Sequence, residues 1–139
     1  MHFTTLYLLK GEELDNVSTS TIEEDFYERF CYGCGENVPK YQYWCDWFQI
    51  GGRWCDILKA KKGLVGERSF CNKDEKQLKN HFSIAEIKDL TGDLDTNYIY
   101  AVATRSRIYH SGSDKYADLI KKINNKQIKG VVALIDCHD

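Results

Sequence analysis

Apolar and polar residues recur along the chain with periods that predict strands and helices. Residues 3–9 form a short apolar run of β-prone side chains, which predicts a first strand. Ser20-Thr21-Ile22-Glu23 is typical of a helix start, and Ile22, Phe26 and Phe30 then recur every four residues. This spacing predicts a first helix with one apolar stripe. The loop at residues 31–40, which contains the single Pro, ends that helix.

The second half of the chain shows the same two periods. Ser83-Ile84-Ala85-Glu86 repeats the helix-start pattern and predicts a short helix to Leu90. Residues 97–104 alternate as a strand does. Ser113 is a suitable cap for a helix over residues 114–124, and residues 129–137 form an apolar last strand. Between the halves, the Lys-rich residues 59–79 predict a surface excursion with room for a short helix at 73–79.

All three Trp residues lie in one aromatic segment, Trp44-Cys45-Asp46-Trp47-Phe48-Gln49-Ile50-Gly51-Gly52-Arg53-Trp54. The Gly51-Gly52 pair allows positive φ at both positions of a tight turn. We therefore expect a β-hairpin at about residues 41–59, with aromatic side chains on both of its faces. Because only one face of a small sheet can cover the core, the other must meet a helix, a ligand or a partner.

The order of these elements predicts an α+β fold. We expect two layers, an antiparallel or mixed sheet of about five strands, and helices mainly on one face. A chain of 139 residues is long enough for one modest core, so residues 1–139 are expected to form a single domain.

Charge and hydropathy narrow the classes of partner. The net charge is −2, with 19 basic and 21 acidic residues, so no global field recruits nucleic acid. The longest apolar run is far shorter than a membrane span, and the first residues lack the pattern of a signal peptide. We therefore expect a cytosolic protein that does not bind membranes.

Six cysteines raise the question of disulfides or metal. Without an export signal, reduced thiols are expected. Cys31 and Cys34 have the C-x-x-C spacing with which a zinc site begins, and Cys45 and Cys55 could complete four ligands. A second C-x-x-C pair is missing, so the prediction is free thiols, no metal and no cofactor, with structural zinc as the alternative.

Four polar residues interrupt otherwise apolar strands and are candidates for a site. Arg53 and Asp46 both lie close to the Gly51-Gly52 turn and could form a structural ion pair. Alternatively, Arg53 anchors a phosphate or carboxylate while Trp47 or Trp54 stacks on a base or on a partner's side chain. Asp136 and His138 are two residues apart on a strand and so point to one side, as a general base or metal ligand with its orienting carboxylate would. A solvated strand end is the other interpretation.

Two resemblances add to this. Asp46-Trp47-Phe48-Gln49-Ile50-Gly51-Gly52-Arg53-Trp54 resembles the D-W-[FY]-x-I-G-G-R-W segment of small uncharacterised proteins of bacteriophages and prophages, which often end in an apolar strand and Asp-Cys-His, here Asp136-Cys137-His138. This resemblance implies a viral origin and no particular reaction.

His2-Phe3-Thr4 and His81-Phe82-Ser83 each resemble the H-Φ-[ST] element of 2H phosphoesterases, which implies two imidazoles acting as acid and base on a phosphodiester. Motifs of ATPases, dinucleotide enzymes, zincins and α/β-hydrolases are missing.

The leading hypothesis is a phage-encoded binding protein of the host cytoplasm that inhibits an antiviral defence system such as CRISPR, by occupying an effector protein or its nucleotide ligand. The alternatives are a small phosphodiester- or nucleotide-processing enzyme with His/Asp acid–base chemistry, through His138 and Asp136 or through His2 and His81, and a structural phage protein. No catalytic residue is assigned in the leading hypothesis. The two family-like motifs are expected to form two walls of one binding site, made of Trp44, Asp46, Trp47, Gly51, Gly52, Arg53, Trp54, Asp136 and His138.

Overall fold

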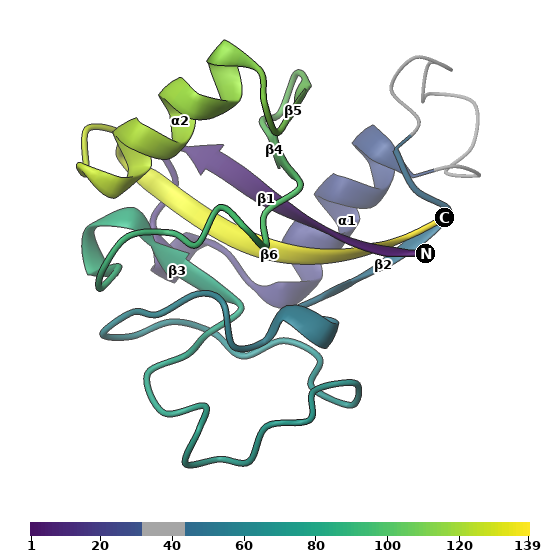
Figure 1. The fold of residues 1–139 in the computed structure, drawn as a ribbon, viewed down its shortest axis with the longest axis vertical. Coiled ribbons are helices and arrows are strands. Elements are labelled where there is room, and N and C mark those ends of the chain that lie inside the picture. Colours follow the sequence, from purple (N-terminus) through teal and green to yellow (C-terminus); the bar gives the residue numbers. More distant parts are fainter. Residues whose placement is uncertain (32–43) are drawn as a thin grey trace.

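A computed structural model describes residues 1–31 and 44–139 (Figure 1). In this part of the chain, an open mixed sheet of six strands is combined with two α-helices, which confirms the expected α+β class. The strands are β1 (His2–Lys10), β2 (Trp47–Ile50), β3 (Ile84–Glu86), β4 (Ala101–Ala103), β5 (Ile108–His110) and β6 (Gly130–His138). The α-helices are α1 (Thr19–Phe30) and α2 (Asp114–Asn124), and short 3-10 helices lie at η1 (Leu14–Asn16), η3 (Gly52–Trp54) and η4 (Ile87–Asp89).

Two long antiparallel strands, β1 and β6, form the centre of the sheet. Their pairing runs from His2 opposite His138 to Lys10 opposite Gly130. The outer edge of β6 is shared by β2, which pairs with its C-terminal half, and β3, which pairs with its N-terminal half. On the other side, β4 is parallel to β1 and β5 follows as the edge strand. Figure 1 shows that the first residues of β1 and the last residues of β6 lie at the same corner of the molecule.

The central strands are apolar on both faces, so both faces need cover. Leu6 and Leu8 of β1 pack in one core cluster with the buried residues of α2, whereas Tyr7 and Leu9 pack in a second cluster with those of α1. Because alternate strand residues point to opposite faces, α2 and α1 lie on opposite faces of the sheet. The expected class therefore holds, but each face carries one α-helix instead of both helices lying on one face.

Both α-helices begin where a side chain satisfies their free N–H groups. The Oγ of Ser113 accepts a hydrogen bond from the Tyr116 N–H at the start of α2, as predicted. In α1 the cap is Ser18, which exchanges hydrogen bonds with Thr21, so the helix begins before the predicted Ser20. The predicted apolar stripe of α1 is buried.

The predicted aromatic hairpin is wrong. Gly51 and Gly52 do have positive φ, +88° and +55°, but the chain continues into η3 and does not fold back on β2. The Gly51 N–H donates to Leu134 O on β6, and the Gly52 N–H donates to Glu67 O. These long-range hydrogen bonds replace the cross-strand bonds of a hairpin, and β2 pairs with β6. Residues 41–43 of the predicted hairpin lie outside the described residues.

The helix predicted from Ser83 to Leu90 is also wrong, since the segment forms β3 and η4. Ser83 is buried, and its main chain bonds Leu64 and Leu134, so sheet pairing overrides its value as a helix cap. The predicted strand at 97–104 is shorter, β4 being Ala101–Ala103, and residues 75–80 form turns.

The cysteines depart in part from the prediction of free thiols. Cys55 and Cys71 form a disulfide, because the excursion after β2 returns and brings their Cα atoms to 6.3 Å. Cys45 and Cys137 are buried free thiols, and Cys31 is also buried. Cys34 lies outside the described residues, and within them no group of three or more His, Cys, Asp or Glu side chains is placed to hold a metal ion. No helix in the described part is long and apolar enough to cross a membrane.

Candidate functional site

The strand register brings three side chains into a row at one end of the sheet. His138 of β6 lies opposite His2 of β1 on one side and opposite Trp47 of β2 on the other. In the next row of the same face, Asp136 lies opposite Thr4 and Gln49. Because residues i and i+2 of a strand share a face, His138 and Asp136 point to the same side, as predicted.

Asp136 is the buried anchor of this arrangement, with 1% of its surface exposed. Its Oδ1 lies 2.9 Å from His2 Nδ1, and its Oδ2 accepts a hydrogen bond of 3.0 Å from the Arg53 N–H. Gly52 makes this possible: a Cβ at that position would lie 2.3 Å from Asp136 Oδ2. The diglycine thus allows the main chain of η3 to close over the carboxylate.

The two imidazoles face each other. His2 Nε2 and His138 Nε2 are joined by a hydrogen bond, and the ring planes are inclined by 77°. Such a bond requires a proton on one Nε2 and a lone pair on the other. The carboxylate of Asp136 bonds the opposite nitrogen of His2, so Asp136 fixes the orientation of that ring and can balance a positive charge on it.

Electrostatics favour the neutral form of the His138 ring. Burial lowers the pKa of His138, and the positive charges of His2, the N-terminal ammonium and Arg53 lower it further, against the opposing effect of Asp136. His138 therefore gives up its proton more readily than an ordinary imidazole does. The same cations make the end of the sheet favourable for an anion.

Aromatic side chains flank the pair. The Trp47 ring stacks on His138 with centroids 4.0 Å apart, and Trp47 remains 44% exposed. Phe70 lies edge-on to His2, with centroids 6.4 Å apart. Since Cys71 follows Phe70 and Cys55 follows Trp54, the disulfide ties the segment that carries Phe70 to the end of η3.

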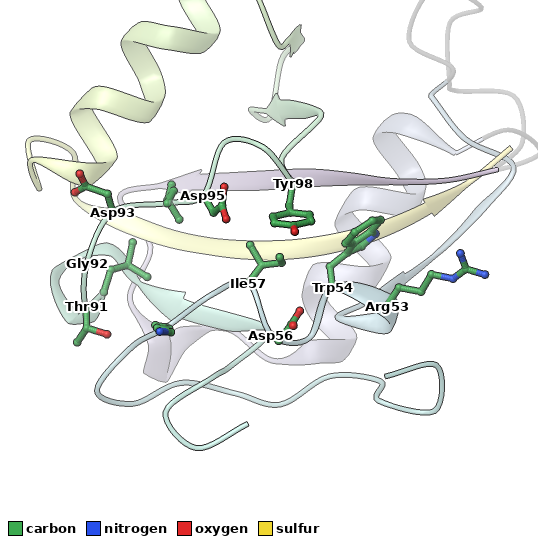
Figure 2. Close-up of a pocket in the computed structure, with 12 residues that line it drawn as sticks. Arg53, Trp54, Asp56, Ile57, Thr91, Gly92, Asp93, Asp95 and Tyr98 are labelled. Carbon is green, nitrogen blue, oxygen red and sulfur yellow. The ribbon is translucent and has the colours of Figure 1, made fainter. Parts of the chain in front are cut away.

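A cavity of about 660 Å³ lies beside this cluster, between η3 and the loop before β4. Figure 2 shows Trp54, Ile57 and Tyr98 around it, with Asp56 and Asp95 close by and the Arg53 side chain extending away from them. The Trp54 and Tyr98 ring centroids are 6.3 Å apart. Arg53 belongs to both places, because its N–H bonds Asp136 and its side chain lines the cavity.

The sequence-predicted residues divide between these places. Trp47, Gly52, Arg53, Asp136 and His138 come together at the end of the sheet, and Trp54 lies in the adjoining cavity. Gly51 supports them by bonding Leu134 O.

Two predicted site residues lie elsewhere or make other contacts. The Trp44 Nε1–H donates to Thr5 Oγ1, and the Trp44 ring packs on Phe3, which belongs to the cluster on the α1 face. The Asp46 N–H bonds His138 O. The ion pairs found within the described residues do not include one between Asp46 and Arg53.

His2 is the residue that sequence reasoning placed in the wrong pair. Its ring contacts Asp136, His138, Trp47 and Phe70. The His81 ring instead bonds the carbonyl of Lys79. Both β1 and β6 were predicted as strands, each with a His at one end. If these two strands had been assumed to pair in antiparallel orientation, His2 would have been placed next to His138. The sequence carried no such signal for Phe70.

Comparison with protein-family models, with curated proteins and with solved structures finds no match for this chain. The fold and the site therefore stand on their own geometry, and the phage origin suggested by the two short motifs stays a prediction.

Proposed function

We propose that this protein is a small phosphodiester-processing enzyme in which His138 acts as general base and His2 as general acid. The observation that carries the proposal is the hydrogen bond between the two Nε2 atoms, with the buried Asp136 carboxylate on the far nitrogen of only one ring. General acid–base catalysis needs one ring with a proton and one without, held at the same place. A structural pair of imidazoles would not need a buried carboxylate to distinguish them.

The chemistry follows from these states. Once the hydrogen bond between the rings opens to admit the diester, His138 Nε2 takes a proton from a water molecule as the water oxygen bonds to phosphorus. His2 Nε2 gives its proton to the leaving oxygen as the old P–O bond breaks. His138 is then protonated and His2 is neutral, and proton transfer along their hydrogen bond restores the pair. Asp136 holds His2 through its Nδ1 and so orients the ring.

Two further observations support an anionic diester as the substrate. Arg53 acts on His138 as a positive charge, and it would attract a phosphate. His2-Phe3-Thr4 also carries the H-Φ-[ST] element that resembles 2H phosphoesterases, with His138 in place of His81 as the second imidazole.

The proposal is tested by the rate of hydrolysis of bis(p-nitrophenyl) phosphate as a function of pH. We expect turnover with an acid limb, because a second proton on the pair removes the base. Since the pKa of His138 is lowered, this limb should inflect below the usual imidazole value of about 6.5. The rate should fall as the pH drops through this inflection.

Arg53→Gln is the matched variant for this profile. It removes one of the cations that lower the pKa of His138 but keeps the N–H that bonds Asp136. The acid limb should therefore move to higher pH. Absence of turnover with this diester and with 2′,3′-cyclic nucleotides, or a profile without an acid limb, would contradict the proposal.

A second candidate function is binding without turnover, as in the expected inhibitor of a host defence system. The exposed Trp47 ring, next to the Arg53 segment, favours it, because Trp and Arg are frequent anchors of protein interfaces. A folded protein that shows no hydrolysis, but whose partner binding is weakened by Trp47→Ala, would favour this function over catalysis.

A further inference from the structure

We propose that the cavity between η3 and the loop before β4 binds the base of a nucleotide, and that it prefers bases with an exocyclic amino group. This inference rests on the proposed function, because it assigns the remainder of a substrate whose phosphate lies at His2 and His138. It names the class of substrate, which the acid–base pair alone does not.

The position of the cavity fits a substrate that spans both places. Arg53 bonds Asp136 through its N–H, and Trp54, the next residue, already lines the cavity. A volume of about 660 Å³ is within the range of sites for small organic ligands. The Arg53 side chain lies at the boundary, where a phosphate attached to a bound nucleoside would be.

Two rings give the cavity flat apolar surface. Trp54 and Tyr98 both line it, and Tyr98 is 51% exposed although it is large and aromatic. Aromatic side chains of this kind stack on the faces of nucleobases. The Trp54 Nε1 is also buried without a hydrogen-bond partner in the described part of the chain, so an acceptor atom of a ligand would satisfy it.

The polar lining selects among bases. Asp56, next to Ile57 in Figure 2, has no hydrogen-bond or ion-pair partner among residues 1–31 and 44–139. Asp93 and Asp95 also line the cavity, and one oxygen of Asp95 is used by the Asn97 N–H. An ionised carboxylate only accepts hydrogen bonds, so the ligand edge that faces it must donate. Cytosine, adenine and guanine carry an amino group, whereas uracil presents carbonyl oxygen where cytosine has its amino group.

Cytidine and uridine 5′-monophosphate form a matched pair of probes, because they differ only at that group and the adjacent ring nitrogen. Calorimetric titration of the wild-type protein should show CMP binding about tenfold or more tightly than UMP, since the wrong base leaves a carboxylate facing an oxygen. This comparison needs no variant and so does not depend on a substitution being tolerated.

Substitutions test which residues cause the preference for CMP over UMP. Asp56→Asn can both donate and accept, so the CMP-to-UMP ratio should fall towards one. Tyr98→Ala should weaken both ligands and leave the ratio unchanged. Asp118→Asn is the control, because Asp118 lies on α2 and pairs with Lys122, and it should change neither affinity.

The outcomes separate this inference from the proposed function. Equal affinity for CMP and UMP, or binding of neither, overturns the base pocket even if diester hydrolysis is found. Selective CMP binding that Asp56→Asn abolishes supports the pocket, and it would do so even if no diester were hydrolysed, in which case the proposed function alone fails.

Discussion

Substitution of His138 or His2 by Gln is expected to lower the rate of diester hydrolysis by roughly 10²- to 10⁴-fold, the usual contribution of a positioned acid or base. Gln keeps a polar side chain of similar length at each position but cannot exchange a proton at neutral pH. The two rings act as one unit through their shared hydrogen bond, so the double variant should be little slower than either single variant. The measurement is kcat with bis(p-nitrophenyl) phosphate at the pH of the maximal rate.

His81→Gln is the control for these variants, because its ring bonds the Lys79 carbonyl and takes no part in the pair. It should hydrolyse the diester at nearly the wild-type rate. Thermal unfolding should show that all variants are folded before their rates are compared. A folded His138→Gln protein with the wild-type rate would remove His138 from the mechanism.

Gly52→Ala is expected to destabilise the protein by about 2–5 kcal/mol. Part of this is the left-handed backbone at φ +55°, which costs an L-residue roughly 1–2 kcal/mol. The rest is overpacking, typically about 1–3 kcal/mol, because the new methyl group would lie 2.3 Å from Asp136 Oδ2 and 2.6 Å from Asp136 Cβ. Denaturant unfolding measures the loss, and displacement of Asp136 should also lower the rate of diester hydrolysis.

Gly92→Ala isolates the backbone contribution. Gly92 also has positive φ, +77°, but a Cβ there meets nothing within 4 Å. This variant should lose only about 1–2 kcal/mol and leave Asp136 undisturbed. If the two substitutions cost the same, the close approach of η3 to the carboxylate has no energetic consequence, and the site is less tightly closed than its geometry indicates.

Local signals were enough to predict the long elements. Strand β1, helix α2 and strand β6 were expected within a residue or two, because apolar runs and a Ser cap specify them without help from the rest of the chain. That Asp136 and His138 lie on the same side of β6 also followed from strand alternation alone. The strands of three residues, β3, β4 and β5, were missed or misjudged, since segments so short owe their conformation to the strands that they pair with.

The site could be predicted only in part for the same reason. The Gly51-Gly52 pair predicted positive φ. The groups that accept hydrogen bonds from this turn, Glu67 and Asp136, are brought there by tertiary folding. His2 was identified through a short motif, yet its true partners lie at the other end of the chain. The polar residues Asp136 and His138 inside an apolar strand were the signal that pointed to the right place, because such groups need partners to be buried.

The pairing of β1 with β6 has a consequence for biosynthesis. His2 and Asp136 are 134 residues apart in sequence, so the innermost ladder of the sheet closes the longest loop in the fold. Contacts between residues so far apart in sequence are slow to form, because closing the loop costs chain entropy before the contacts stabilise it. On the ribosome, β1 is synthesised before β6, so it stays unpaired, with both apolar faces uncovered, until β6 has been made. Catalysis by this pair would then require complete folding. The enzyme activity of a mixed preparation would therefore measure its fraction of completely folded molecules.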